Sequence, residues 1–325
     1  MSIVKLGFGV LASVTLVCYT VAVWVSDEPE PFDVVALAQQ QAQPAQPVVG
    51  FTTTTTLIHV IDTLLQKPGG YIANDLLPPF SLLDNMPAWE LGALEMVRDL
   101  ALAMRKDLSR SQSQSVENAY LKLAQPKLNI DHRNWAVPAA ETEYTEAARY
   151  LRSYQRALLE PDSRDHQFYA RADNLRDWLK AIEKRLGSYS QRLSASVGQD
   201  RLNTDLAGDA QARQSTYAPA EFMLKTSWWK IDDEFYEARG AAWALLHFLQ
   251  AIEVDFADVL ARKNASVSLQ QIIRELEATQ QTVWSPMVLN GSGFGLLANH
   301  SLVMANYISR ANAALIDLNE LLAQG

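Results

Sequence analysis

Apolar residues recur at alternating steps of three and four along most of this chain, the spacing of α-helices with one buried face. Four long stretches keep that spacing, and each has the pattern of an a/d seam. The positions are Ala140, Tyr144, Ala147, Leu151, Tyr154 and Leu158; Phe168, Ala172, Leu175, Leu179, Ile182, Leu186, Tyr189 and Leu193; Phe235, Ala238, Ala242, Leu245, Leu249, Ile252, Phe256 and Val259; and Leu297, Ser301, Met304, Ile308, Ala311, Leu315, Leu318 and Leu322. No comparable stretch alternates with period two, so the pattern predicts an all-α fold without a substantial sheet.

The prolines support this prediction because all 13 are confined to a few places. An interior proline costs a helix about 3 kcal/mol, so long helices are expected in the long proline-free windows. The short loop 160–165 between the first two long helices favours an antiparallel helical hairpin whose seams face each other. Shorter helices are expected over 52–66, 88–110, about 114–124 and 268–283.

The helix around 240–260 is the most apolar of the long helices, which predicts a central position in an elongated bundle. Its start carries Asp232 as a candidate N-cap, and Asp233 and Glu234 place negative charge in the first turn. Ile231 and Tyr236 occupy the positions of a hydrophobic staple.

An uncharged stretch of 20 residues, Leu6–Val25, predicts a membrane-spanning helix about 30 Å long. Lys5 precedes it and acidic residues follow it, so the positive-inside rule places the N-terminus in the cytoplasm and the rest of the chain outside. Trp24 lies where an aromatic residue would mark the far interface. A cleaved signal peptide is the alternative, since Thr20-Val21-Ala22 is an acceptable cleavage motif, but the apolar run is longer than a usual signal core.

The next residues, 26–50, hold four prolines and five glutamines and few core-forming side chains. This composition predicts a flexible tether, within which 34–43 could form a short helix. The expected domain organisation is therefore a transmembrane anchor (1–25), a Pro/Gln-rich tether (26–50) and a periplasmic helical domain (51–325).

Charge and cysteine content exclude several classes of function. The net charge of −9 disfavours nucleic-acid binding, which requires a positive field. The single cysteine, Cys18, excludes intramolecular disulfides and cysteine-based zinc sites. The five histidines lie far apart, without the spacing of a metal site, so neither a metal ion nor another cofactor is expected. His247 is expected to be a hydrogen-bonded core imidazole.

The acidic run Asp232, Asp233, Glu234 and Glu237 follows two tryptophans, and carboxylates beside aromatic residues can serve a glycoside hydrolase. Helix capping already accounts for three of these acids, so no catalytic residue is assigned. A hydrolase would require two of these carboxyl groups to line one open cleft.

Three aromatic residues are candidates for partner binding: Trp228, Trp229 and Phe294. Core packing is the general expectation for tryptophan. Adjacent side chains on a helix point about 100° apart, however, so one of the pair could be exposed to a partner or to lipid headgroups. Phe294 lies in the glycine-rich segment 290–297, which fits a helix-to-helix turn better than a phosphate-binding loop.

The segments VVGFTTTTTLIHVIDTLLQKPGGYIANDLLPPF and SWWKIDDEFYEARG, together with the N-terminal apolar stretch, resemble a family of Gram-negative bacterial inner-membrane proteins classified as a domain of unknown function. The resemblance covers nearly the whole chain. It implies a membrane-bound envelope protein and implies no activity, substrate or catalytic residue.

The sequence therefore predicts a non-enzymatic scaffold or partner-binding protein, held in the bacterial inner membrane and facing the periplasm. The alternative is a cell-wall hydrolase or another envelope enzyme that uses the carboxylates of 232–237. The helical seams could also mediate self-association into a homo-oligomer.

Overall fold

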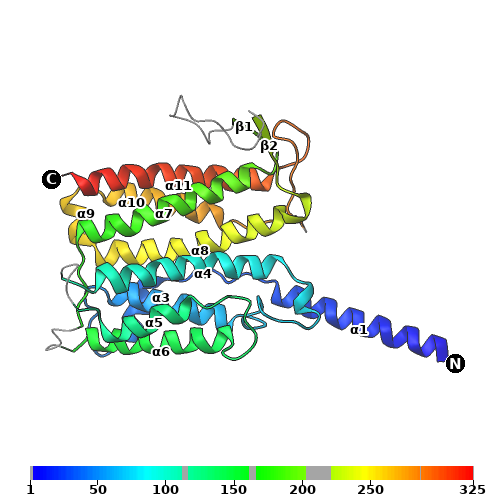
Figure 1. Cartoon of the computed structure of the whole chain (residues 1–325), viewed down its shortest axis with the longest axis horizontal. Coiled ribbons are helices and arrows are strands. Elements are labelled where there is room, and N and C mark those ends of the chain that lie inside the picture. The colour runs from blue at the N-terminus through cyan, green and yellow to red at the C-terminus, as the bar shows by residue number, and fades with distance from the viewer. Residues whose placement is uncertain (1–2, 112–115, 161–165, 203–220, 286, 325) are drawn as a thin grey trace, which may run out of the picture.

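The computed structural model describes residues 3–111, 116–160, 166–202, 221–285 and 287–324. Long helices run side by side along the longest axis of an elongated bundle, and one helix projects from one end (Figure 1). The helices are α1 (Ile3–Val25), α2 (Val34–Ala42), α3 (Phe51–Gln66), α4 (Asn85–Ala103), α5 (Ala119–Leu128), α6 (Ala140–Leu158), α7 (Ala172–Ser194), α8 (Ile231–Asp255), α9 (Ala257–Arg262), α10 (Ser266–Thr279) and α11 (His300–Ala323). The all-α prediction is confirmed.

Short elements complete the described chain. They are the 3-10 turns η1 (Phe80–Leu82) and η3 (Trp228–Lys230), the π-helical turn η2 (Met104–Leu108), and the strands β1 (Gln199–Leu202) and β2 (Glu221–Leu224). Within the described residues the two strands form a two-stranded antiparallel sheet, with Gln199 opposite Leu224.

Helices α4 and α8 form the centre of the bundle. Helices α3, α5 and α6 lie on one side of this pair, and α7, α10 and α11 lie on the other (Figure 1). Buried side chains occur along nearly the whole length of α8, which confirms its predicted central position.

Glycines bring α4 and α8 unusually close together. A Cβ atom on Gly92 would overlap the carbonyl oxygen of Glu237, and one on Gly240 would overlap the carbonyl oxygen of Trp89. The two backbones are therefore in direct contact where these helices cross, and a larger residue at either glycine would push them apart.

Helices α6 and α7 do not form the antiparallel hairpin that was expected, and each packs against other helices. Both helices form where the seams predict, but α6 packs against α3 and α5, whereas α7 packs against α11 (Figure 1). Just before α7, Tyr169 N donates to Leu108 O at 2.7 Å, a contact with the end of the η2 turn. A heptad seam specifies a buried face and leaves its partner open, which explains the difference.

The threonine run starts α3 and is fully buried. The carboxylate of Asp255, at the end of α8, accepts hydrogen bonds from Thr53 N (2.7 Å) and Thr53 Oγ1 (2.6 Å). Thr54 and Thr56 donate their hydroxyls to backbone carbonyls four residues earlier, so these poor helix formers satisfy their own polar groups. The start of α3 is thus capped by a distant residue.

Candidate functional surface at the end of the bundle

Helix α1 leaves one end of the bundle and extends away from it (Figure 1). Its segment Gly7–Val25, 19 residues, is long and apolar enough to cross a membrane, a property shared by signal sequences. The large apolar side chains from Phe8 to Trp24 are mostly exposed, and Val25, with 0% exposure, is the point where α1 enters the body.

Val25 packs into the turn that follows α3. Gly69 in this turn has a φ of +83°, and a Cβ atom there would lie 2.8 Å from Cγ1 of Val25. Only glycine combines this left-handed conformation with such close contact. The KPGG sequence of residues 67–70 therefore forms the socket in which α1 ends.

A buried ion pair holds this turn in place. Lys67 Nζ lies 2.6 Å from Oε1 of Glu90, and both side chains are almost completely buried. Glu90 also accepts hydrogen bonds from Ile72 N and Ala73 N, and Lys67 donates to Gly70 O. Burial raises the pKa of Glu90 to about 7, against the opposing effect of Lys67. The ion pair fixes both ends of the turn that contacts α1.

The segment expected to be a flexible tether is packed on the body. Nε of Arg239 lies 2.6 Å from the carboxylate of Glu28, and the ring of Phe32 stacks on His247 with 4.0 Å between centroids. The short helix considered for 34–43 forms as α2, capped by Asp33. Few core-forming residues are enough in this segment, because the body supplies the surface against which they pack.

Four connecting segments lie at the end from which α1 emerges: 67–84, 129–139, 225–230 and the described residues of 280–299, which are 280–285 and 287–299. Each carries large apolar side chains that are exposed to solvent. We call this set the apolar end face; it comprises Leu76, Leu77, Leu82, Trp135, Val137, Trp228, Trp229, Trp284, Met287, Phe294, Leu296 and Leu297.

Contacts connect these loops to one another and to the base of α1. Asn74 Nδ2 donates to Asn134 O at 3.0 Å, which joins the first loop to the second. Lys230 lines the same cavity as residues 72–88. Residues 280–283 line another cavity together with 26–31, directly after α1. The four loops are therefore linked to one another or to the residues that follow α1, at the same end of the body.

All three predicted partner-binding residues lie on this face. Trp228 and Trp229 form the turn η3, with 68% and 77% exposure, and their rings meet edge to face at 4.9 Å. Phe294 is fully exposed in the loop between α10 and α11. The general expectation of core packing is thus wrong for both tryptophans, because η3 lies before the first buried turn of α8.

Sequence reasoning missed Trp135 and Trp284, which are also exposed. Each stands in a polar segment shortly before a proline, Pro138 and Pro286 respectively, outside any helical seam. An isolated tryptophan in a proline-bearing loop is the signal that could have identified them.

A family model described as "uncharacterized protein conserved in bacteria (DUF2333)" matches residues 2–325. The chain belongs to this family. Neither the curated proteins nor the solved structures contain a match.

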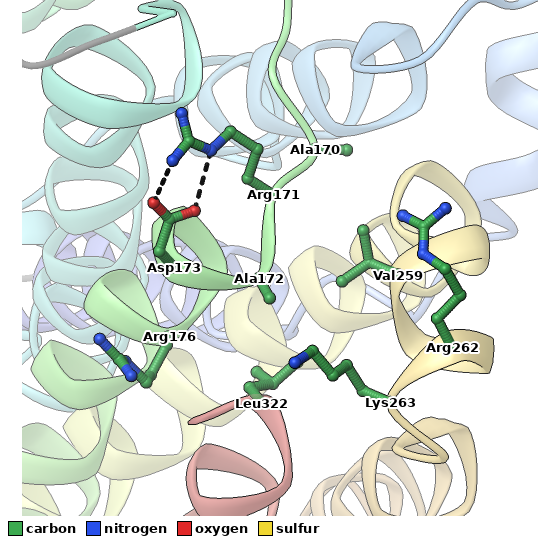
Figure 2. Close-up of a pocket in the computed structure, with 9 residues that line it drawn as sticks. All are labelled: Ala170, Arg171, Ala172, Asp173, Arg176, Val259, Arg262, Lys263 and Leu322. Carbon is green, nitrogen blue, oxygen red and sulfur yellow. Dashed lines mark hydrogen bonds and ion pairs between the residues drawn. The ribbon is translucent and has the colours of Figure 1, made fainter. Parts of the chain in front are cut away.

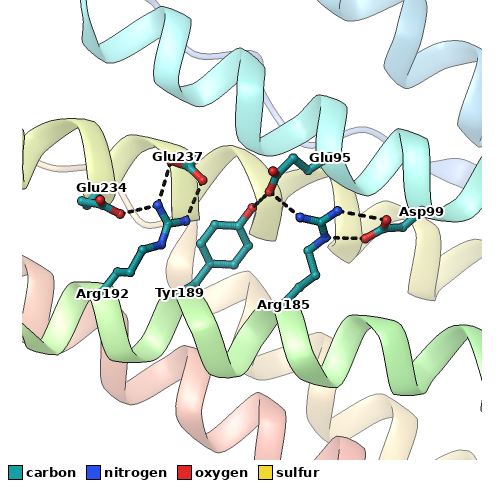
Figure 3. Close-up of polar contacts among 7 residues, drawn as sticks. All are labelled: Glu95, Asp99, Arg185, Tyr189, Arg192, Glu234 and Glu237. Atoms are coloured by element: carbon teal, nitrogen blue, oxygen red, sulfur yellow. Dashed lines mark hydrogen bonds and ion pairs between the residues drawn. The ribbon is translucent and has the colours of Figure 1, made fainter. Parts of the chain in front are cut away.

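In this DUF2333 protein, three of the acidic residues considered for catalysis line one cavity of about 610 Å³ near the end face: Asp233, Glu234 and Glu237. Burial raises the pKa values of Asp233 and Glu234. Arg192 of α7 lies 2.5 Å from Glu234 and 2.6 Å from Glu237 (Figure 3), so both carboxylates are already paired. Asp232, predicted as the N-cap, instead lies in the first turn of α8, which begins at Ile231.

The same polar seam continues along α7. Arg185 bridges Asp99 at 2.5 Å and Glu95 at 3.0 Å, and Tyr189 donates its hydroxyl to Glu95 at 2.6 Å (Figure 3). These charge-assisted contacts join α7 to the central pair of helices, which indicates a structural role.

A second cavity, of about 400 Å³, lies among α7, α9 and the end of α11, at the opposite end of the bundle. Its cationic side chains are Arg171, Arg176, Arg262 and Lys263. Arg171 is held by Asp173, and the guanidinium groups of Arg176 and Arg262 point in different directions (Figure 2). The cations do not converge on one position where an anion could bind.

Among the described residues, no group of three or more His, Cys, Asp or Glu side chains could hold a metal ion. His247 is fully buried and hydrogen-bonded to Phe32 N and Trp243 O, as predicted for a core imidazole.

Proposed function

We propose that this protein is a membrane-anchored helical scaffold that binds partner proteins of the bacterial cell envelope. In this proposal α1 spans the inner membrane with its N-terminus in the cytoplasm, and the bundle lies in the periplasm. Lys5 before the apolar stretch and the acidic residues after it favour this orientation.

One observation carries the proposal: α1 is exposed along its apolar length and is fixed to the body at its end. Val25 fills the socket at Gly69, and Glu28 pairs with Arg239. A helix with so much exposed apolar surface requires a nonpolar environment. The fixed junction would hold the body in a defined orientation, which suits a scaffold.

Reporter fusions test the orientation. Alkaline phosphatase fused after Gly325 should be active, because it folds in the periplasm, whereas a cytosol-dependent reporter at the same position should be inactive. The opposite result would refute the proposed topology.

In-cell crosslinking of the full chain tests the scaffold role. Defined envelope proteins should be recovered reproducibly, together with any crosslinks between copies of the chain. Failure to recover the same partners in repeated experiments would count against a scaffold.

The alternative is an envelope hydrolase, and the acid-lined cavity with Asp233 and Glu234 is the observation that favours it. The purified chain would then cleave cell-wall fragments, and Asp233→Asn or Glu234→Gln would abolish the cleavage. Because Arg192 neutralises Glu234 and Glu237, we expect no cleavage by the unmodified protein.

A further inference from the structure

We propose that the apolar end face inserts into the interfacial layer of the membrane leaflet from which α1 emerges. The occupant of this face is thus the lipid bilayer itself. The inference rests on the part of the proposed function that places α1 across a membrane, and it adds a second membrane contact made by the body.

The distribution of exposed aromatic side chains is the first argument. Within the described part of the body, every exposed aromatic residue lies on the end face: Trp135, Trp228, Trp229, Trp284 and Phe294. The remaining tryptophans of the body are buried. Tryptophan concentrates at membrane–water interfaces because its ring is apolar and its N–H remains hydrogen-bonded to the headgroup region.

The length of α1 places the membrane–water interface at the level of the apolar end face. The span Gly7–Val25 has 19 residues, which at 1.5 Å per residue gives about 28 Å, close to the thickness of the hydrocarbon core. The boundary of the hydrocarbon therefore falls near Val25, where α1 enters the body. Trp24 is next to this boundary, and the four loops of the end face lie at the same end of the body.

The junction between α1 and the body, residues 25–32, has no free length of chain that could hold the end face away from the lipid. Val25 is in contact with the Gly69 turn, and Glu28 and Phe32 are bound to α8 within the next seven residues. In Figure 1, α1 runs close to the direction of the bundle axis. A membrane crossed by α1 would consequently face the end of the bundle, and the flanks would remain in water.

The charges near this face favour apolar insertion over electrostatic attraction. Asp75, Asp84, Asp233, Glu234 and Glu237 line the cavity between these loops, against the exposed basic residues Arg133 and Lys230. Binding should therefore need no anionic lipid and should change little with salt, unlike the binding of a polybasic segment.

Depth-dependent fluorescence quenching in vesicles can test this contact. The full chain is reconstituted into zwitterionic phosphatidylcholine vesicles that contain lipids with a quencher at the level of the upper acyl chain. A polarity-sensitive dye is attached to Cys introduced by Trp284→Cys or Phe294→Cys in a Cys18→Ala background. Both side chains are almost fully exposed, so the substitutions leave the core intact.

The control site is Val267, which is also apolar and 75% exposed. It lies in the first turn of α10, shortly after α9, and Figure 1 shows α9 at the opposite end of the bundle. We expect the lipid quencher to reduce the emission of dyes at 284 and 294 several-fold more than that of a dye at 267. Dissolved iodide should show the reverse preference. Equal quenching by lipid at all three sites would overturn the proposal.

The native Cys18 separates this inference from the anchoring of α1. Quenching of a dye at Cys18, without quenching at 284 and 294, would retain the anchor and refute the inserted end face. No quenching at Cys18 would refute the anchor as well. Shielding of 284 and 294 from iodide without lipid quenching would show that a protein partner or a second copy covers the face, which also overturns the proposal.

Discussion

The imidazole of His247 accepts a hydrogen bond from Phe32 N, 215 positions earlier in the chain, at 3.0 Å. Its Nδ1 lies 2.7 Å from Trp243 O. A carbonyl oxygen only accepts hydrogen bonds, so Nδ1 carries the proton and Nε2 is the acceptor. The neutral ring is therefore the form that holds Phe32, and burial lowers the pKa of His247 to about 4.

Acidification should weaken this contact. Between about pH 6.5 and pH 4 the unfolded chain binds a proton at His247 that the folded chain does not, so the free energy of unfolding falls as the pH falls. The full contribution is roughly 3 kcal/mol for a pKa difference of this size. Urea unfolding at pH 7 and pH 4.5 measures it.

His247→Asn provides the reference for this measurement, because it removes the titrating group. Burial raises the pKa values of Asp255 and Glu90, to about 6 and about 7, so these two groups favour folding as the pH falls. The contribution of His247 is therefore the difference in the pH dependence of unfolding between the unmodified chain and His247→Asn. An identical pH dependence in both would contradict the prediction.

The buried pair of Lys67 and Glu90 gives a second prediction at this scale. Lys67→Met should lower the free energy of unfolding by about 3–5 kcal/mol, because it leaves the Glu90 carboxylate buried without a counter-charge. Adding Glu90→Gln should restore part of that loss, since the amide oxygen can still accept from the backbone of the turn. Additive losses in the double variant would show that the two side chains are not coupled.

At the scale of elements, the contact between α4 and α8 depends on two residues that lack side chains. Gly240→Ala should lower the free energy of unfolding by at least about 3 kcal/mol, because the new methyl group overlaps the backbone of Trp89 and the packed core cannot yield. Thermal or urea unfolding measures the loss.

Gly187→Ala in α7 is the matched control, since the nearest atom to the new Cβ, Nδ2 of Asn312, lies 3.7 Å away. There the substitution should stabilise the protein by about 0.5–1 kcal/mol through helix propensity alone. Equal effects at the two glycines would show that the close approach of α4 and α8 is not the cause.

The long helices also show what the spacing of apolar residues predicts and what it leaves open. The seams placed α6, α7, α8 and α11 within a few residues of their observed bounds, because each helix buries one continuous stripe. They left the partner of each stripe open, so the expected pairing of α6 with α7 was not observed. The capping of α3 by Asp255 joins residues 202 positions apart and leaves no local signal.

On the scale of the whole molecule, the contacts at the junction predict that α1 is a rigid extension of the bundle. Spin labels at Thr20→Cys in α1 and Val303→Cys in α11, in a Cys18→Ala background, should give one narrow distance distribution. Glu28→Ala combined with Phe32→Ala should broaden it, because two of the contacts that fix the junction are lost, while the packing of Val25 remains.

A label pair within the body, at Val267→Cys and Val303→Cys, should keep the same distribution in both backgrounds. A broad distribution between α1 and α11 in the otherwise unmodified chain would instead support the flexible tether that composition predicts. Broadening within the body would indicate general unfolding.

The candidate surface was only partly predictable. Trp228, Trp229 and Phe294 were candidates from the sequence, because adjacent tryptophans and a glycine-rich loop stand out locally, and their role in partner binding stays a prediction. That they share one face with Trp135 and Trp284 depends on loops separated by tens to more than a hundred residues. Exposure is a property of what packs on a side chain, which local patterns do not record.

The sequence by itself determined the helical class, the location of the long helices and the apolar N-terminal helix, because these follow from the spacing of apolar residues and from the positions of proline. Only the tertiary structure decided which helices pair, that residues 26–42 pack on α3 and α8, and that the exposed aromatic residues of the body lie in loops at the end where α1 leaves it. The physical reason is that periodicity is set by neighbouring residues, whereas pairing and exposure are set by contacts between residues distant in the chain.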